Sequence, residues 1–253
     1  MSTSSGVVGH APNAAPLVGF TGLPFGLSFV AGLVDTTTFV TLAGLFSAHI
    51  TGNLVVLAAD LAASRPIGVA AVLAIPTFIV VTAIATILHE RARTNSETAV
   101  GWFLGVQCVL IVATATLGIL THASTEPASF AGVATGLLAV AAMATQNSLL
   151  QLTQSPAPST AVMTGNLVLA TIALTQIVLR RRSPDPVTIK KWRSHWPLLA
   201  GFFVGCLIAG VVCRRLVDDG WVVSVIASLL LLLWWALARR RASSVHSPRR
   251  QPD

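Results

Sequence analysis

The sequence predicts an all-α polytopic membrane protein with a two-fold internal repeat and eight hydrophobic segments, of which six to eight span the bilayer. Three observations predict this class: 54% of the 253 residues are apolar, only 10% are charged, and the mean hydropathy is +0.77. A soluble domain carries about 25% charged residues, and a disordered chain has low hydrophobicity. The composition therefore excludes both of these classes and makes the lipid bilayer the first expected partner.

Eight apolar stretches are candidate spans, since a span needs about 20 mostly apolar residues. They cover residues 24–45, 50–63, 67–88, 102–120, 128–149, 160–179, 198–212 and 221–238. The second and sixth stretches each contain a Gly-Asn pair near their start, and the second is short. Either can be re-entrant, because non-helical backbone is tolerated where it lines a cavity. We expect six full crossings, with eight as the alternative.

The charge distribution predicts the orientation of the chain. Lys and Arg number 16 against 9 Asp and Glu, which gives a formal net charge of +7. With six crossings thirteen of the 16 basic residues share one side, and with eight crossings twelve do. Both arrangements obey the positive-inside rule and place both termini in the cytoplasm. The basic loops thus report topology and can attract anionic lipids, and we expect no nucleic-acid partner.

The two ends of the chain differ from the membrane region. Residues 1–19 are rich in Ser, Gly, Ala and Pro and contain no Lys or Arg. A cleaved signal peptide needs a basic stretch before its apolar run, so we expect a disordered N-terminal tail instead. Residues 241–253 are expected to form a basic cytoplasmic tail.

An internal repeat divides the membrane region into residues 20–122 and 127–240. Each half carries a glycine pair, a segment with a polar centre and a Thr-Gly-Asn motif. These features are Gly22-xxx-Gly26, Asp35 and Thr51-Gly52-Asn53 in the first half, and Gly132-xxx-Gly136, Gln146 and Thr164-Gly165-Asn166 in the second. The offset is 113 residues for Thr-Gly-Asn and 110 for the glycine pairs. With six crossings the halves are inverted in topology, and with eight they are parallel.

Glycine pairs let helix backbones approach closely in lipid, where packing drives helix association. Gly101-xxx-Gly105 and Gly201-xxx-Gly205 add two more pairs to those of the repeat. We assign all four pairs to helix packing.

Asp35 lies near the middle of the first segment, at about the bilayer centre. An Asp at this depth costs on the order of 2.5–3.5 kcal/mol by insertion scales, so it must be paired, protonated or facing water. Its helical face contains Ser28, Gly32 and Thr38, which are small or polar and indicate the bundle interior. Two interpretations stay open: a helix–helix hydrogen bond to Thr or Asn, and a proton, ion or substrate site.

The first Thr-Gly-Asn motif suggests a second polar element near Asp35. His49 and Asn53 share one helical face, and free N–H groups at a helix start attract anions. Imidazole titrates near neutral pH, so an Asp35–His49 relay is conceivable. The alternative is that Gly52 packs a helix crossing and the Asn side chains join two helices.

The second half lacks this charged chemistry. It has Val162 where the first half has His49, and Gln146 with Asn147 near the position of Asp35. A single asymmetric site fits this difference better than two equivalent sites.

These motifs resemble those of one family. Residues 32–39 read Gly-Leu-Val-Asp-Thr-Thr-Thr-Phe, and residues 44–53 read Gly-Leu-Phe-Ser-Ala-His-Ile-Thr-Gly-Asn. With residues 143–147 and 160–166 of the second half, they resemble the YoaK-like family of bacterial membrane proteins over about residues 20–240. Ile50 stands where that family usually has methionine, and Ala144 where it has glycine. The resemblance implies a multi-pass protein of the bacterial inner membrane, in a family of unknown function.

Function must therefore be argued from the pattern. The sequence contains no His-Glu-x-x-His, Gly-x-Ser-x-Gly, phosphate-loop or Cys-x-x-Cys signature, so we expect no enzyme, no metal and no cofactor. Duplicated halves with interrupted segments in matching positions predict a small secondary transporter or exporter of a small solute or ion. The alternative is a non-transporting scaffold or assembly factor whose polar residues only hold helices together. A homo-oligomer is left open.

The predicted path surrounds the bilayer midplane, with the amides of the second half opposite the carboxylate of the first. Its residues are Asp35, His49, Thr51, Gly52, Asn53, Gln146, Asn147, Thr164, Gly165 and Asn166. The pattern does not separate cations from anions, because Asp35 favours the former and helix starts favour the latter.

Overall fold

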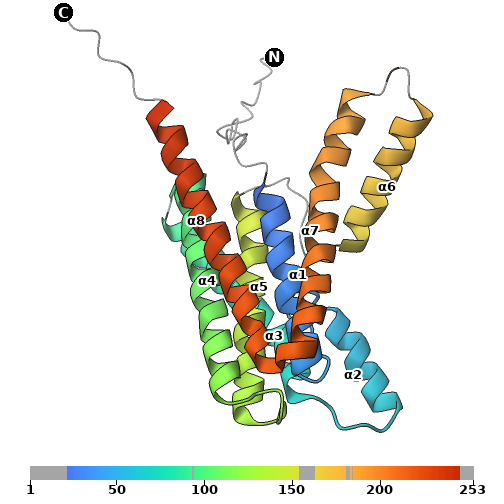
Figure 1. Ribbon diagram of the computed structural model, residues 1–253, viewed down its shortest axis with the longest axis vertical. Helices are drawn as coiled ribbons and strands as arrows, with labels where there is room; N and C mark the ends of the chain where they lie inside the picture. Colours follow the sequence, from blue (N-terminus) through green and yellow to red (C-terminus); the bar gives the residue numbers. More distant parts are fainter. Residues whose placement is uncertain (1–21, 93, 154–162, 181–182, 184, 246–253) are drawn as a thin grey trace, which may run out of the picture.

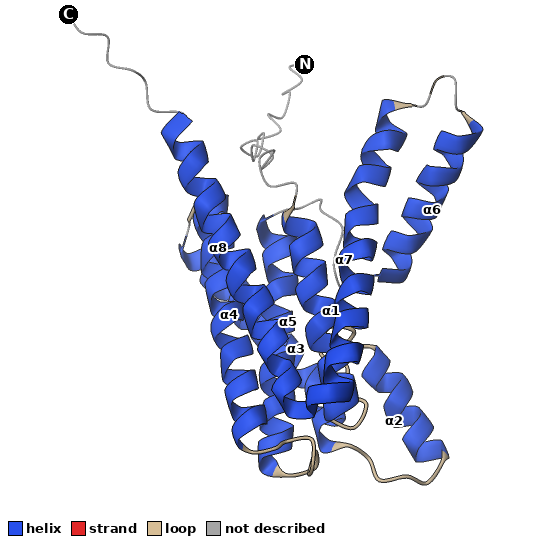
Figure 2. Ribbon diagram, in the orientation of Figure 1, coloured by secondary structure: helices blue, strands red, loops and turns tan. Residues whose placement is uncertain are grey.

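The computed structural model describes residues 22–92, 94–153, 163–180, 183 and 185–245, and in these residues all regular structure is helical (Figure 2). The helices are α1 (Leu23–Thr41), α2 (Gly52–Ala62), α3 (Val69–Ala92), α4 (Ser96–Leu120), α5 (Phe130–Thr153), α6 (Met163–Leu179), α7 (Pro186–Leu216) and α8 (Trp221–Val245). A short 3-10 turn, Val217–Gly220, joins α7 to α8. Each of the eight predicted segments overlaps one of these helices.

Most of the helices are long and apolar enough to cross a bilayer. Helices α1, α3, α4 and α5 qualify, as does the stretch Pro186–Arg241, which contains α7 and most of α8. At 1.5 Å per residue, even the 19 residues of α1 approach the ~30 Å of the hydrocarbon core. Helices α2 and α6 have only 11 and 17 residues. The chain is therefore a polytopic α-helical membrane protein, as its composition predicts.

The long helices run alternately between two ends of the bundle (Figure 1). We name the end at which α1 begins and α8 ends the basic end. There the start of α4 meets the end of α8, with Arg239 Nε 3.8 Å from Glu97 Oε2. At the opposite end the Ser124 hydroxyl donates to Asp218 Oδ2 at 2.6 Å, which joins the α4–α5 loop to the α7–α8 turn.

This arrangement favours six crossings. Most of the described basic residues lie at the basic end. Those at this end are Arg91, Arg180, Lys190, Lys191, Arg193, Arg239, Arg240 and Arg241. The opposite end carries Arg65, Arg214 and Arg215. The division is the one that six crossings predict, with the start of α1 and the end of α8 on the same side.

The helices pack in a scheme that stays the same when the two halves are exchanged. Helix α1 packs on α7 and α8, α5 packs on α3 and α4, and α4 packs on α8. The short helix α2 packs on α3, and α6 packs on α7. Helices α1 and α5 run in opposite directions, and α2 and α6 continue toward opposite ends (Figure 1). This scheme has the symmetry that an inverted duplication predicts, with α1–α2 and α5–α6 as interrupted segments.

Glycines bring α1 and α7 into backbone contact. A Cβ atom at Gly32 would overlap the carbonyl oxygen of Phe202, and one at Gly205 would overlap that of Phe29. Gly201 lies equally close to α1. The Gly201-xxx-Gly205 pair therefore packs helices, as predicted.

The other three pairs differ from one another. Gly22 and Gly26 contact Trp234 and Leu231 of α8. Gly101 contacts Trp235, whereas a Cβ at Gly105 would meet nothing within 4 Å. Gly132 contacts the loop before its own helix, and Gly136 contacts Leu45 and Ala70. The packing role predicted for every pair is thus wrong for Gly105, and Gly132 packs against its own loop.

Two predicted boundaries need correction. Helix α7 begins at Pro186 rather than near residue 198, because the Asp185 side chain accepts from the Val187 N–H and caps it. Its 31 residues extend about 46 Å, so its basic first turns lie beyond the apolar stretch that marks the span. Residues 241–245 continue α8 instead of beginning a tail. The predicted N-terminal tail, 1–19, and residues 246–253 lie outside the described residues.

Candidate functional site

Asp35 holds the loop between α1 and α2 against α1. The residue is only 4% exposed. Its Oδ1 accepts from the backbone N–H groups of Ser47 and Ala48, both at 2.7 Å, and from the Ser47 hydroxyl at 3.3 Å. Its Oδ2 lies 2.8 Å from Nδ1 of His49. The carboxylate that the sequence places at the bilayer centre is therefore surrounded by donors from one loop.

Asn53 holds the same loop from the α2 side. Its side chain is fully buried; Oδ1 accepts from the Phe46 N–H at 2.9 Å, and Nδ2 donates to the Phe46 carbonyl at 2.8 Å. Gly52 packs on the Phe46 ring, where a Cβ would lie 2.8 Å from Cδ2. Thr51 is exposed and makes no capping hydrogen bond. The first Thr-Gly-Asn motif thus shapes the loop 42–51.

The start of α2 does not present the free N–H groups expected from the motif. The N–H groups of residues 52–54 donate to the carbonyl oxygens of residues 49–51 in tight turns, at 2.8, 3.1 and 3.2 Å. Because these donors are used, the helix start has little attraction left for an anion. The sequence left open whether the site binds a cation or an anion, and this geometry favours a cation.

The Asp35–His49 pair lines a cavity of about 450 Å³. The other described lining residues are Thr36 and Phe39 of α1, Phe46 of the loop, and Phe202 and Cys206 of α7. Small-molecule sites have volumes of about 300–1,000 Å³ and are mostly apolar with a few polar groups. The cavity is open on one side, and its volume and lining match those of sites for small organic molecules.

Aromatic rings form most of the cavity wall. The Phe39 and Phe46 rings have centroids 4.9 Å apart, and the His49 ring meets that of Phe202 edge-on at 4.8 Å. Phe202 reaches the loop because Gly32 allows α7 to touch α1 one turn before Asp35. The close contact at Gly32 thus positions one wall of the cavity.

Gln146 of the second half contacts α1 away from Asp35. Gln146 Nε2 donates to the Leu27 carbonyl at 3.0 Å, and Gln146 Oε1 accepts from Gln107 Nε2 at 2.8 Å. Leu27 is two helical turns before Asp35, about 12 Å along α1. Asn147 donates to the Met143 carbonyl of its own helix. Gln146 therefore joins α5 to α1 and α4 and does not lie opposite Asp35.

The second Thr-Gly-Asn motif opens α6, which packs on α7. Asn166 is buried and Thr164 is exposed. Neither these two nor Gly165 are among the described residues that line the cavity. The loop before this motif, 154–162, lies outside the described residues. Of the predicted path, Asp35 and His49 are in contact and line the cavity, and Asn53 holds the same loop through Phe46. Thr51, Gly52 and Asn53 are likewise not among the described lining residues.

Sequence reasoning missed the aromatic wall of the cavity. Phe39 follows Asp35 by four residues and so shares its helical face, a signal that could have identified it. Phe46 and Phe202 had no such signal, because their positions depend on the fold of the loop and on the α1–α7 contact.

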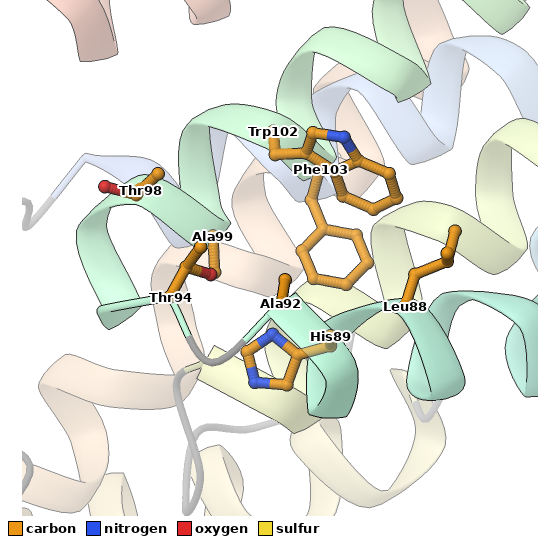
Figure 3. A pocket seen from close by; sticks show the side chains of 8 residues that line it. All are labelled: Leu88, His89, Ala92, Thr94, Thr98, Ala99, Trp102 and Phe103. Carbon is orange, nitrogen blue, oxygen red and sulfur yellow. The ribbon is translucent and has the colours of Figure 1, made fainter.

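A second, smaller pocket of about 210 Å³ lies where α3 ends and α4 begins (Figure 3). The His89 ring faces that of Phe103, with centroids 6.1 Å apart, and Trp102 and two threonines complete the wall. None of its described lining residues is acidic. The cavity at Asp35 is larger and holds an acid–base pair, and it is the stronger candidate.

Comparison with models of known protein families shows to which family the chain belongs. The model of a family described as a protein of unknown function, DUF1275, matches residues 23–236. The chain belongs to the DUF1275 family. The match includes both Thr-Gly-Asn motifs, and the expected resemblance to YoaK-like membrane proteins is consistent with it. No curated protein and no solved structure matches the chain. The family description names no activity, and the membrane character of the chain comes from its long apolar helices.

Proposed function

We propose that this DUF1275 protein is a small secondary transporter or exporter whose solute binds in the cavity beside Asp35. One observation carries the proposal: a buried carboxylate, paired with a titratable imidazole at 2.8 Å, lines a cavity between an interrupted helical segment and α7. Ionisable residues inside the membrane typically mark substrate or proton paths. Interrupted segments of inverted repeats are where secondary transporters bind their substrates.

The geometry suggests how binding is coupled to movement. The loop 42–51 forms one wall of the cavity and is held by Asp35 and Asn53, whereas α7 of the other half forms the facing wall. A change in the charge of the Asp35–His49 pair changes the strength of the contacts that hold the loop. Rocking of one half against the other would then expose the cavity to the two sides in turn.

The setting of the protein is part of the proposal. We place it in the bacterial inner membrane, because the motifs resemble those of bacterial membrane proteins. We place both termini in the cytoplasm, because the basic end carries most of the described Lys and Arg residues. We assign the protein no enzymatic step.

A non-transporting scaffold is the second candidate, and one observation favours it. Both oxygens of the Asp35 carboxylate are hydrogen-bonded to residues of a single loop, which is what a purely structural residue would do. A scaffold and a transporter differ in one respect: only the transporter binds a solute through Asp35.

Melting of the purified protein in detergent tests the proposal. We would screen inorganic ions, amines and small metabolites against the wild type, Asp35→Asn and the control Asp60→Asn. Asp60 is a matched carboxylate on α2, paired with Arg65 at 2.9 Å and not among the described lining residues. The proposal expects a ligand that raises the melting temperature of the wild type and the control but not of Asp35→Asn. A screen in which no ligand stabilises the wild type would support the scaffold.

A further inference from the structure

The charge of the cavity is carried by a small set of groups. Its described lining residues include one carboxylate, Asp35 of α1, one imidazole, His49 of the loop, and one thiol, Cys206 of α7. No Lys or Arg is among them. The Asp35–His49 pair is neutral overall when the imidazole is protonated and has a net negative charge when it is not. A net charge inside the bilayer is unfavourable, so the unprotonated pair attracts a compensating cation.

The carboxylate has room for such a cation. Oδ1 already accepts three hydrogen bonds from Ser47 and Ala48, whereas Oδ2 accepts only from His49 among the described residues. Of the two lone pairs of Oδ2, the contact with His49 uses one. A positive group can therefore reach Oδ2 without releasing the backbone N–H groups that hold the loop.

The wall of the cavity favours an organic cation over a metal ion. Ca²⁺ and Mg²⁺ need about six or more oxygen ligands, and this wall is mostly aromatic. Phe39, Phe46 and Phe202 line the cavity, and aromatic faces attract ammonium groups within about 6 Å. Anions find little attraction, because the N–H groups at the start of α2 are already used.

We infer that the solute is a small organic cation with an apolar body, and that it exchanges for a proton held by the Asp35–His49 pair. The inference rests on the proposed function and names its substrate class and its coupling ion. On binding, the cation pairs with the Asp35 carboxylate and the protonated imidazole releases its proton to water. On release of the cation, the imidazole takes up a proton from water, so that one proton is exchanged for each monovalent cation. The His49 side chain is 24% exposed and lines the cavity, so its ring is not sealed off from the bound cation.

Calorimetric titration of the full-length protein in detergent tests the exchange. The probes are phenyltrimethylammonium, whose charge is fixed, and benzenesulfonate, an anion of similar size. Titration in buffers of different ionisation enthalpy counts the protons released. For the wild type at low pH, where the imidazole is protonated, we expect close to one proton released per bound cation. The affinity for the cation should rise by about tenfold per pH unit in this range and become independent of pH once the imidazole is unprotonated.

Three variants separate the contributions of the pair. His49→Gln should bind phenyltrimethylammonium with no proton release and with an affinity independent of pH. Asp35→Asn should not bind it. His195→Gln is the matched control, because this exposed imidazole on α7 bonds the Lys191 carbonyl and is not among the lining residues; it should behave as the wild type. Retention volume and melting temperature show whether each variant is folded.

The outcomes distinguish this inference from the proposed function. If phenyltrimethylammonium fails to bind, or benzenesulfonate binds as tightly, the substrate class is wrong. If the cation binds without proton release, or if His49→Gln keeps the wild-type pH dependence, the exchange is wrong. In both cases the proposed function still stands if another ligand stabilises the wild type but not Asp35→Asn in the melting screen.

Discussion

The Asp35 carboxylate and the His49 imidazole lie 2.8 Å apart, and both line the cavity between α1 and α7. Only 14 residues separate them in the chain. One short segment therefore supplies the acid, the base and the loop that connects them, while the other half of the molecule supplies the facing wall. Because the two walls of the cavity belong to different halves, movement of one half relative to the other would change the shape of the site.

The contacts of Asp35 predict that its variants differ in stability. In Asp35→Asn the side-chain oxygen can still accept from the Ser47 and Ala48 N–H groups, so we expect a loss of about 1–2 kcal/mol. Asp35→Leu leaves both buried N–H groups without an acceptor, and we expect a loss of about 2–4 kcal/mol. Unfolding in mixed micelles measures both values. Equal losses for the two variants would contradict the role given to Oδ1.

Asn53 should be more important to stability than its position at a helix start suggests. Asn53→Ala removes two hydrogen bonds to Phe46 and leaves a buried N–H and a buried carbonyl unpaired, which we expect to lower the free energy of unfolding by about 2–3 kcal/mol. Asn95→Ala is the matched control, because Asn95 caps α4 through one exposed hydrogen bond, a contact whose loss costs about 1 kcal/mol. If the control loses as much as Asn53→Ala, the loop-holding role of Asn53 is wrong.

Substitution of alanine for two helical glycines should change the stability of the protein in opposite directions. Gly32→Ala places a Cβ against the Phe202 backbone, and forcing α1 and α7 apart should cost about 1–3 kcal/mol. Gly105→Ala meets nothing within 4 Å and should gain about 0.5–1 kcal/mol from its higher helix propensity. Melting temperatures of the two variants give the comparison. A neutral Gly32→Ala would show that the backbone contact between α1 and α7 is not required.

The six-crossing arrangement can be tested by labelling single cysteines in a background without native cysteines. The end of α3 lies at the basic end with the end of α8, so Arg91→Cys should react with an impermeant reagent from the side that carries the C-terminus. Arg65→Cys and His122→Cys should react from the other side. The reverse pattern relative to the C-terminus is the one that eight crossings require.

Much of the architecture follows from local properties of the sequence. Apolar length placed eight helices, and the unfavourable burial of a charge predicted that Asp35 must have a partner. The ionisable imidazole also suggested an Asp35–His49 relay, and the two side chains are in contact. These inferences succeeded because each depends on a segment and its solvent and not on the packing of distant helices.

Other features depend on tertiary structure and were not accessible in the same way. Gln146 was expected opposite Asp35 from its place in the repeat, but the two helices meet two turns away, at Leu27. The start of α7 was placed too late, because its basic first turns lower the hydropathy while Asp185 still caps the helix. Phe46 and Phe202 reach the cavity only through the folded loop and the contact at Gly32.

Solute flux in proteoliposomes tests the central claim most directly. The ligand found by melting would be loaded on one side, and its movement compared for the wild type, Asp35→Asn, Asp60→Asn and empty liposomes, with equal amounts of inserted protein. The account predicts flux for the wild type and for Asp60→Asn, and none above empty liposomes for Asp35→Asn. Flux at the wild-type rate through Asp35→Asn would contradict it.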